Sequence, residues 1–248
     1  MTIKYNQPTM GRVRRAILKL SGELFGNKEN HISFEKYNEV ARQLVEIQKK
    51  TKIQLAVVVG GGNIFRGRKA NHGVDRTQAD YMGMMATIMN GIGLREALVR
   101  NGADDTRLMT SINIPQVAEP FILIKGRHHL TNGRMVVIAG GLGIPYFSTD
   151  SAVAQYAASL DCDIIFKAST VDGVYDSDPR INAKAKKYPE LSYRTALDQR
   201  LGVMDITAFA MCESSGIPIF VFDIKDLARL PEAIRGNYSF GTIIRGGQ

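Results

Sequence analysis

Two glycine-rich turns follow apolar stretches of this sequence, and each lies near charged side chains. Gly60-Gly61-Gly62 comes directly after Val57-Val58-Val59 and is followed by Arg66, whereas Gly140-Gly141-Leu142-Gly143 leads to Ser148-Thr149-Asp150. Glycine lets the backbone come close to a ligand, and backbone amides together with a guanidinium group suit a phosphate. On its own, the first turn fits a tight strand-to-helix connection with a surface arginine equally well.

Two lysines are expected at the carboxyl ends of strands. Lys19 precedes Ser21-Gly22, and Lys167 directly follows the apolar stretch 162–166. Ligands of open α/β sheets gather at this edge, although a lysine there can also serve solubility alone. Two glycine turns and two lysines are more than one phosphate needs, which predicts two phosphorylated ligands that meet at this edge. Neither turn matches the P-loop or the G-x-G-x-x-G pattern, so P-loop NTPases are excluded.

The acids near these turns have two interpretations each. Asp150 falls in the first turn of a helix predicted over 150–160 and capped by Ser148 or Thr149, where it can complement the helix dipole or hold the charges of a site in register. Asp80 falls in the first turn of a helix predicted over about 77–100. There its carboxylate can complement the helix dipole, or it can face the first glycine turn and accept hydrogen bonds from sugar hydroxyls. The turn-rich loop 168–180 is a surface loop by default, but Tyr175 could stack on a base and Asp178 could bind a ribose.

Apolar stretches and helical patterns alternate along the whole chain. Strands are predicted at 13–20, 53–59, 107–110, 162–166, 217–222 and near 242–244, and helices at 37–48, 77–100, 150–160, 193–200, 205–215 and 226–234. The stretches 121–125 and 134–138 flank a predicted loop whose Asn132-Gly133 is a strong turn signal. This alternation predicts an α/β fold with a largely parallel central sheet covered on both faces. Residues 1–11 are expected to be a flexible arm, and 12–248, which contain no repeat or linker, a single domain.

Composition restricts the possible partners. The 248 residues carry a net charge of +8 but contain no block of five or six like charges, which favours small anions over nucleic acid. The two cysteines are too few for a disulfide framework, and no apolar stretch suits a membrane span or a signal peptide, so a cytoplasmic protein is expected. One stripe of helix 77–100 is expected in the core or at a subunit contact; it consists of Tyr81, Met84, Met85, Ile88, Met89 and Ile92.

Phosphoryl transfer suits this set of groups. The reaction needs alignment and neutralisation of oxygens that repel one another, which lysine, arginine, Mg²⁺ and backbone amides supply. An acceptor that is itself a phosphate is mostly ionised near neutral pH, because its second pKa is about 6, so no general base is required. The lack of an obvious catalytic histidine is therefore compatible with this chemistry.

Six groups of short segments carry a family resemblance. They are Lys19-Leu20-Ser21-Gly22-Glu23, Val59 to Gly67, Asp80-Tyr81-Met82-Gly83-Met84 with Met89-Asn90-Gly91, Pro145 to Asp150, Lys167-Ala168 with Val171 to Tyr175, and Val203-Met204-Asp205. Together, in this order over residues 12 to 245, they resemble the bacterial uridylate (UMP) kinases of the amino acid kinase superfamily. The resemblance implies a three-layer αβα sandwich and a homohexamer that transfers the γ-phosphate of ATP to UMP in pyrimidine nucleotide biosynthesis. Mg²⁺ is implied on the ATP phosphates, with no metal site made of protein side chains.

The same resemblance implies roles for individual residues. The catalytic residues would be Lys19, Arg66, Asp150, Lys167 and Asp205. ATP would contact Lys19, Leu20, Ser21, Gly22, Gly62 and Arg66 through its phosphates and Ser169, Tyr175 and Asp178 through its nucleoside. UMP would contact Gly61, Asp80 through the ribose, and Leu142, Gly143, Ile144, Pro145, Tyr146, Phe147, Ser148 and Thr149. UMP would thus bind mainly to the N-terminal two-thirds of the chain and ATP mainly to the C-terminal part, with GTP as a possible activator and UTP as a possible inhibitor.

The chain departs from the family pattern in the second glycine turn. Members often carry Thr and Asn where this chain has Leu142 and Ile144, a change that spares backbone contacts to the nucleotide but affects side-chain contacts. Acetylglutamate, aspartate and carbamate kinases are the alternatives within the same fold, and the segments 80–83 and 145–150 favour a nucleotide acceptor over them. A nucleic-acid-binding regulator is the alternative from another class, and the lack of a basic stripe argues against it.

Overall fold

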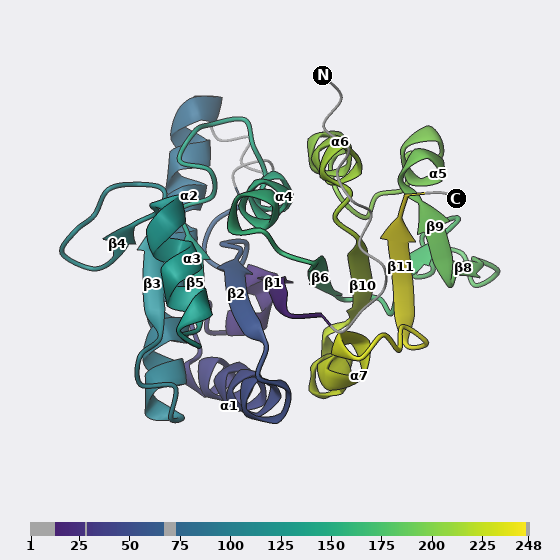
Figure 1. Ribbon diagram of the computed structural model, residues 1–248. Helices are drawn as coiled ribbons and strands as arrows, with labels where there is room; N and C mark the ends of the chain where they lie inside the picture. Colours follow the sequence, from purple (N-terminus) through teal and green to yellow (C-terminus); the bar gives the residue numbers. More distant parts are fainter. Residues whose placement is uncertain (1–12, 28, 67–72, 247–248) are drawn as a thin grey trace, which may run out of the picture.

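A nine-stranded sheet forms the middle of the structure, a computed structural model that describes residues 13–27, 29–66 and 73–246 (Figure 1). The strand order is β4-β3-β5-β2-β1-β6-β10-β11-β9. The strands are β1 Arg15–Leu20, β2 Gln54–Val59, β3 Arg107–Thr110, β4 Glu119–Pro120, β5 Val136–Ala139, β6 Ile164–Ser169, β9 Glu190–Ser192, β10 Ile219–Asp223 and β11 Gly241–Arg245. Within these residues all neighbouring pairs are parallel except β10–β11, which confirms the predicted largely parallel sheet. The predicted arm 1–11 lies outside the described residues.

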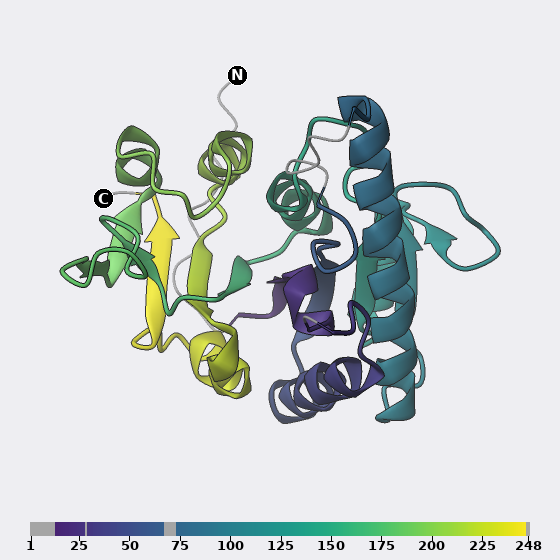
Figure 2. The ribbon, with the colours of Figure 1, turned by 180° about the vertical axis from the view of Figure 1, so that it is seen from behind.

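Helices cover both faces of this sheet and complete a three-layer αβα sandwich. One face carries α1 (Phe34–Thr51), α2 (Arg76–Arg100) and α7 (Leu230–Ile234), and the other carries α3 (Leu123–Thr131), α4 (Thr149–Leu160), α5 (Tyr193–Asp198) and α6 (Ile206–Ser215). Figure 2 shows α1 and α2 across the face that is turned away in Figure 1. Because side chains alternate along a strand, Leu18 of β1 packs in the core between the sheet and α1 and α2, whereas Ile17 packs in the core between the sheet and α4.

The segment before Asn132-Gly133 differs from the prediction. The structure has helix α3 over Leu123–Thr131, where a loop was predicted to follow the apolar stretch 121–125. A short apolar stretch does not by itself distinguish a strand from the first turn of a helix, which explains the difference. The Asn-Gly pair ends this helix: the amide of Asn132 donates to the carbonyl of His128 at 3.1 Å, and Gly133 adopts φ +74°.

Several element ends also differ from the predicted ones. Strand β6 extends to Ser169, so that Lys167 lies inside the strand and not after it. The predicted helix 226–234 is divided into a 3₁₀ helix, η3 (Ile224–Arg229), and α7, because Pro231 fits only the first turn of an α-helix. Gly22–Phe25 forms a short 3₁₀ helix, η1, and Val174–Tyr175 (β7) pairs with Lys187–Tyr188 (β8) in a second small sheet.

Helix α2 starts earlier than predicted, which changes the position of Asp80. Asp75 is the N-cap, and its carboxylate accepts hydrogen bonds from the amides of Thr77 and Gln78 at 2.9 and 3.3 Å. The prediction that Asp80 lies in the first turn is therefore wrong, since it is the fifth residue of the helix and lies in the second turn. The predicted apolar stripe of this helix is divided: Met84 and Ile88 are buried, whereas Tyr81, Met85, Met89 and Ile92 are exposed.

Candidate active site

Lys19 and Lys167 lie side by side in the centre of the sheet. β1 and β6 are neighbouring parallel strands, and their register pairs these two residues, so both side chains leave the same face. Both ammonium groups contact Asp150: Nζ of Lys167 lies 2.6 Å from Oδ2, and Nζ of Lys19 lies 3.5 Å from Oδ1. The three side chains are between 10% and 17% exposed. The fold thus brings two predicted lysines onto one predicted acid.

Ser148 begins α4 and positions Asp150. Its Oγ accepts hydrogen bonds from the amides of Asp150 and Ser151 at 3.0 and 3.2 Å, as predicted for a cap. Burial alone would raise the pKa of Asp150, but the charges of Lys167 and Lys19 outweigh this effect and hold its pKa below the usual value. Burial lowers the pKa of Lys167, and the charge of Asp150 opposes part of this change. Asp150 is therefore ionised at neutral pH.

Asp205 joins this centre through hydroxyl groups. It is the N-cap of α6 and accepts a hydrogen bond from the amide of Ala208 at 2.8 Å. Ser151 Oγ lies 3.0 Å from each of its carboxylate oxygens, and Ser148 Oγ donates to Oδ2. Lys167 also donates to the carbonyl of Val203, just before α6. Asp205 thus ties the start of α6 to the start of α4, beside the lysines. We refer to Lys19, Asp150, Lys167 and Asp205 as the charged centre.

Asn90 of α2 supports the first glycine turn. Its Nδ2 donates to the carbonyl of Gly60 and to Oδ1 of Asn63, each at 2.7 Å. Its Oδ1 accepts a hydrogen bond from the hydroxyl of Tyr37 at 2.6 Å, and the Asn90 side chain is fully buried. A buried amide with partners on both ends fixes the backbone around it, because rotation would leave polar groups unpaired.

Gly22 and Gly61 allow the backbone segments of the site to pack closely. A Cβ at Gly61 would lie 2.8 Å from Cβ of Ala86 and 2.9 Å from the carbonyl of Gly83, both on α2. A Cβ at Gly22 would lie 2.7 Å from the amide nitrogen of Gly62. Neither position has room for a larger residue, so these glycines fix the distance between η1, the glycine turn and α2.

Three hydroxyl groups support the second glycine turn. The amide of Gly140 donates to Oγ1 of Thr87 at 2.7 Å, and Oγ of Ser111 donates to the carbonyl of Gly140 at 2.7 Å. The hydroxyl of Tyr156 donates to the carbonyl of Gly141 at 2.8 Å. Gly140 and Gly141 adopt φ +88° and +59°, values that explain why glycine occupies both positions.

Two clefts open beside the charged centre. The first has a volume of about 310 Å³ and lies between the glycine turns and α2. Its lining residues are Lys19, Gly61, Gly62, Phe65, Ala79, Asp80, Gly83, Met84, Thr87, Gly141, Phe147, Ser148, Thr149 and Asp150. The second has a volume of about 510 Å³ and is lined by Lys167, Val221, residues 169–171, residues 173–180 and residues 199–203. Each cleft therefore reaches one of the two lysines.

The structure brings about half of the predicted ligand-binding residues to these clefts. Ser169, Tyr175 and Asp178 line the second cleft together, and the predicted UMP residues at the first cleft are Gly61, Asp80, Phe147, Ser148 and Thr149. In the described part of the chain, residues 142–146 are not among those that line the first cleft. Leu142 packs against the hydrophobic core, and the side chain of Ile144 is half exposed.

The predicted phosphate-binding residues of the donor are more dispersed. Gly62 lines the first cleft, whereas Leu20 is fully buried in the core and Ser21 lines neither cleft. Arg66 is half exposed; its Nε donates to the carbonyl of Gly62 at 3.0 Å and its guanidinium pairs with Glu23. The guanidinium is therefore next to the glycine turn, as its spacing in the sequence suggested.

The sequence indicated no supporting role for Thr87, Asn90 or Ser151, although Asn90 belongs to the segment 89–91 that carries the family resemblance. All three are buried polar residues on otherwise apolar helix faces, which is the signal that could have identified them. Each makes side-chain hydrogen bonds to a glycine turn or to Asp205. They hold the site in shape without any of the charge that marks Lys19 or Asp150.

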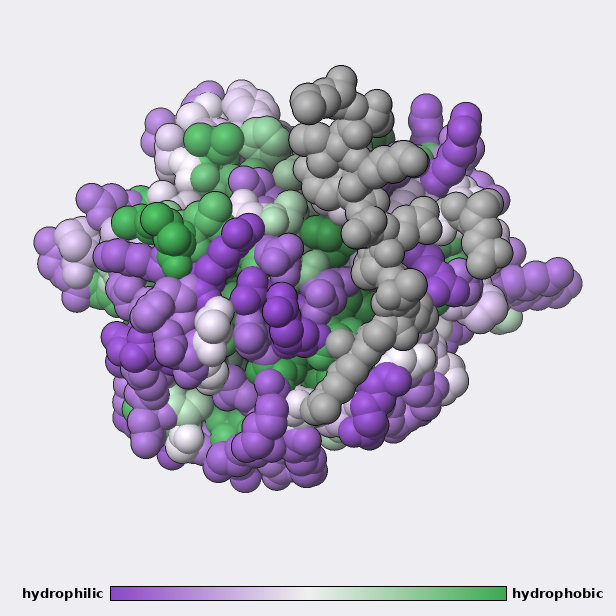
Figure 3. Space-filling view, in the orientation of Figure 1, coloured by the Kyte–Doolittle hydropathy of each residue, from purple (hydrophilic) through white to green (hydrophobic). Residues whose placement is uncertain are grey.

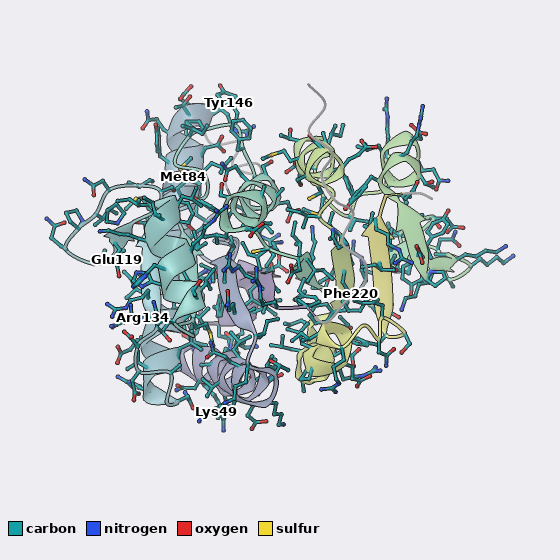
Figure 4. All side chains as sticks on the ribbon, in the orientation of Figure 1. Lys49, Met84, Glu119, Arg134, Tyr146 and Phe220 are labelled. Carbon is teal, nitrogen blue, oxygen red and sulfur yellow. The ribbon has the colours of Figure 1, made fainter. Side chains whose placement is uncertain are left out.

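The described residues contain no group of three or more His, Cys, Asp or Glu side chains that could hold a metal ion. Asp150 is bound by lysines and Asp205 by hydroxyls and an amide. His129 contacts Glu119 and Arg134, at 3.1 Å each, on the side of the molecule where Figure 4 labels the latter two. This donor set fits a divalent cation that arrives on the oxygens of its ligand better than one caged by protein side chains.

Comparison with known proteins gives a consistent result. The sequence model of the amino acid kinase family matches residues 14–223. A uridylate kinase from Corynebacterium glutamicum (strain R) is 40% identical over 245 residues, which is 98% of this chain and 99% of that protein. Among solved structures, UMP kinase from Bacillus anthracis is similar with a TM-score of 0.91 and 34% identity, covering 96% of this chain and 98% of its own. UMP kinase from Ureaplasma parvum has a TM-score of 0.87 and 36% identity, covering 95% and 100%.

Proposed function

This chain belongs to the amino acid kinase family and is an ATP-dependent nucleoside monophosphate kinase, and from this premise we propose that it transfers the γ-phosphate of ATP to UMP, giving UDP and ADP. The observation that carries the proposal is that two clefts meet at one charged centre. Lys19 and Asp150 line the first cleft, and Lys167, which is paired with Asp150, lines the second. UMP occupies the first cleft, ATP the second, and their phosphates meet at the two lysines. The product feeds the synthesis of pyrimidine nucleotides.

The reaction proceeds by electrostatic alignment without a general base. The UMP phosphate is mostly ionised at neutral pH, so its oxygen attacks the γ-phosphorus directly. Lys19, Lys167 and Arg66 neutralise the oxygens that would otherwise repel, and Asp150 holds the two ammonium groups beside each other. In the part of the chain that the structure describes, neither cleft is lined by a histidine. Mg²⁺ on the ATP phosphates supplies further neutralisation of charge.

The acceptor nucleotide is held between α2 and the second glycine turn. Asp80 accepts hydrogen bonds from the ribose, and Gly61 lets the UMP phosphate approach the backbone. Phe147, Ser148 and Thr149 contact UMP from the other side, which their place in the lining supports. Leu142, Gly143, Ile144, Pro145 and Tyr146 act through their backbone, because Leu142 faces the core and Ile144 the solvent.

The donor nucleotide spans the centre of the sheet and the second cleft. Its phosphates contact Lys19, Gly62, Arg66 and the backbone of residues 20–22, and its nucleoside contacts Ser169, Tyr175 and Asp178. Ser169, Tyr175 and Asp178 all line the second cleft, which supports this assignment. In this proposal UMP binds mainly to the N-terminal two-thirds of the chain, and ATP, whose nucleoside occupies the second cleft, binds mainly to the C-terminal part.

A cytoplasmic homohexamer, activation by GTP and inhibition by UTP complete the proposal. Exposed apolar side chains support assembly: Met82, Met85, Met89 and Ile92 lie on α2, and Val117, Ile122, Leu123 and Ile124 lie near β4 and the start of α3. Figure 3 shows a hydrophobic area on the side that carries β4. Light scattering should give the mass of a hexamer, and a monomer would refute this part. No helix among the described residues is long and apolar enough to cross a membrane.

An ADP-release assay with separate acceptors tests the proposed reaction. UMP, CMP, AMP, acetylglutamate, aspartate and carbamate are each offered with ATP and Mg²⁺, and turnover should be highest with UMP. No turnover with UMP, or a higher rate with an amino acid or carbamate, would overturn the proposal.

A matched pair of lysine variants shows whether the turnover depends on the charged centre. Lys19→Met should reduce kcat by at least about a hundredfold, the typical effect of removing one preorganised electrostatic group. Lys49→Met removes the same charge from an exposed position on α1, near the opposite edge of the sheet (Figure 4), and should leave kcat unchanged. Equal activity of both variants would contradict the assignment.

A further inference from the structure

One oxygen of the Asp80 carboxylate is already occupied by two protein donors. Nε of Arg76, one turn earlier in α2, lies 2.9 Å from Oδ2, and the backbone amide of Tyr146 donates to the same oxygen at 2.8 Å. Among the described residues no hydrogen bond to Oδ1 is present. Asp80 lines the first cleft, and its side chain is 13% exposed. The carboxylate is thus fixed through Oδ2 and keeps Oδ1 as an acceptor for a ligand.

Arg76 and Tyr146 also contact each other. The guanidinium carbon of Arg76 lies 5.2 Å from the centre of the Tyr146 ring, within the range of a cation–π contact. Tyr146 adopts φ +71°, a backbone conformation that residues with a side chain seldom take. Figure 4 places Tyr146 at the end of α2 where this helix begins. We call these two residues, which connect α2 to the second glycine turn, the Arg76–Tyr146 clasp.

An ordinary helix-surface ion pair would explain only part of this arrangement. Arg100 and Glu96, in the last turns of the same helix, show what such a pair is like: Nε lies 3.1 Å from Oε1, and the side chains are 69% and 50% exposed. Pairs of this kind contribute little to stability. The Asp80 pair differs because its acid is mostly buried, lines a cleft and accepts a second hydrogen bond from a distant loop.

We propose that the Arg76–Tyr146 clasp presets Asp80 for the sugar of the acceptor nucleotide, which makes Arg76 a positioning residue that determines the preference for ribose over deoxyribose. This inference rests on the proposed function. With Oδ2 held, Oδ1 can accept hydrogen bonds from sugar hydroxyls at a fixed position. A site built around a hydroxyl discriminates against a sugar that lacks it, because the acceptor is then left unpaired. A carboxylate that is free to rotate loses this discrimination.

The test compares Arg76→Gln with Arg100→Gln, because each removes an arginine that pairs with an acid four residues earlier or later on α2. Initial rates are measured with UMP and with dUMP as acceptors. Arg76→Gln should raise KM for UMP about tenfold, the effect of one charge-assisted hydrogen bond, and change kcat by less than about twofold. The ratio of kcat/KM for UMP over dUMP should fall about tenfold. Arg100→Gln should leave all of these values unchanged.

A second variant keeps the test independent of folding. Tyr146→Ala removes the ring over which Arg76 lies but keeps the amide, and it should raise KM for UMP and lower the UMP/dUMP ratio in the same direction. Thermal melting of all three variants shows whether they fold as the wild type does.

The possible outcomes separate the two proposals. If the wild type phosphorylates UMP while Arg76→Gln leaves both KM and the UMP/dUMP ratio unchanged, the clasp has no role in positioning. A rise in KM that is equal for UMP and dUMP would likewise refute it, since it would show a general effect on the loop. If the wild type does not phosphorylate UMP at all, the proposed function is refuted and this inference with it.

Discussion

The substitution Asp150→Asn tests the charged centre most directly. Asp150 lies 2.6 Å from Nζ of Lys167 and 3.5 Å from Nζ of Lys19. With an effective dielectric constant of about 20, these distances correspond to attractions of about 6 and about 5 kcal/mol before the loss of hydration is counted. Asparagine has almost the same shape but no charge, so it removes both attractions and leaves two neighbouring ammonium groups that repel each other.

The free energy of unfolding and the turnover should change by different amounts in this variant. Removing one partner of a buried ion pair costs about 3–5 kcal/mol, and we expect about 3 kcal/mol because Lys167 keeps the carbonyl of Val203 as an acceptor. Since domains are typically stable by about 5–15 kcal/mol, most molecules should remain folded at 25 °C. Turnover should fall by about a thousandfold, because both lysines lose the group that aligns them with the phosphates.

Urea unfolding followed by circular dichroism measures the free energy of unfolding, and ADP release with saturating UMP and ATP measures kcat. Asp161→Asn is the matched control: it removes the same charge at the other end of α4, where Asp161 is exposed and adopts φ +61°, a conformation that asparagine tolerates. The control should keep wild-type turnover. If Asp150→Asn kept at least half of the wild-type kcat, or unfolded while its activity per folded molecule stayed normal, the assignment of Asp150 to the charged centre would be wrong.

Three further predictions follow from the same geometry. The charges of Lys167 and Lys19 hold the pKa of Asp150 below its ordinary value, so its ion pairs stabilise the fold at neutral pH and lose this effect as the pH falls through the lowered pKa. Urea midpoints measured from pH 6 to 2.5 should therefore decline less steeply at the acid end for Asp150→Asn than for the wild type. Asn90→Ala leaves the Gly60 carbonyl, Asn63 and the Tyr37 hydroxyl without their partner, and should lower the free energy of unfolding by about 3 kcal/mol; a loss below 1 kcal/mol in urea titrations would contradict this role. Gly61→Ala should destabilise the protein by more than about 1 kcal/mol, because its Cβ would meet α2 at 2.8–3.0 Å, whereas Gly62→Ala, whose nearest neighbour lies at 3.8 Å, should melt as the wild type does and change only KM values.

The class of the fold could be predicted from the sequence because its signals are local. Apolar strands and amphipathic helices alternate along the chain, and glycine turns interrupt them, so a largely parallel sheet with helices on both faces followed without any knowledge of contacts. Predictions were wrong where a local signal has two outcomes. The stretch before Asn132-Gly133 forms α3, since the same Asn-Gly pair that closes a hairpin can also end a helix. Asp80 lies in the second turn of α2 and not in the predicted first turn, because Asp75 caps the helix earlier than predicted.

Local sequence patterns could not predict the roles of the residues that support the site. Asn90 and Ser151 carry no charge, and although Asn90 belongs to the segment 89–91 that carries the family resemblance, neither position indicates by itself what its side chain contacts. Asn90 reaches the carbonyl of Gly60, and Ser151 reaches Asp205 in another helix. Such contacts depend on how α2 and α4 pack against the sheet, which sequence spacing does not describe.

The sequence by itself determined which chemical groups lie in or just after the carboxyl-terminal halves of the strands: two lysines, two glycine turns and an acid at a helix start. These are properties of short segments, and their chemistry already indicated phosphate ligands. Only the tertiary structure decided that Lys19 and Lys167 share Asp150, because this depends on β1 and β6 being neighbours in register. Ion pairing falls off within a few ångströms, so whether three distant charges act as one centre is set by the order and register of the strands.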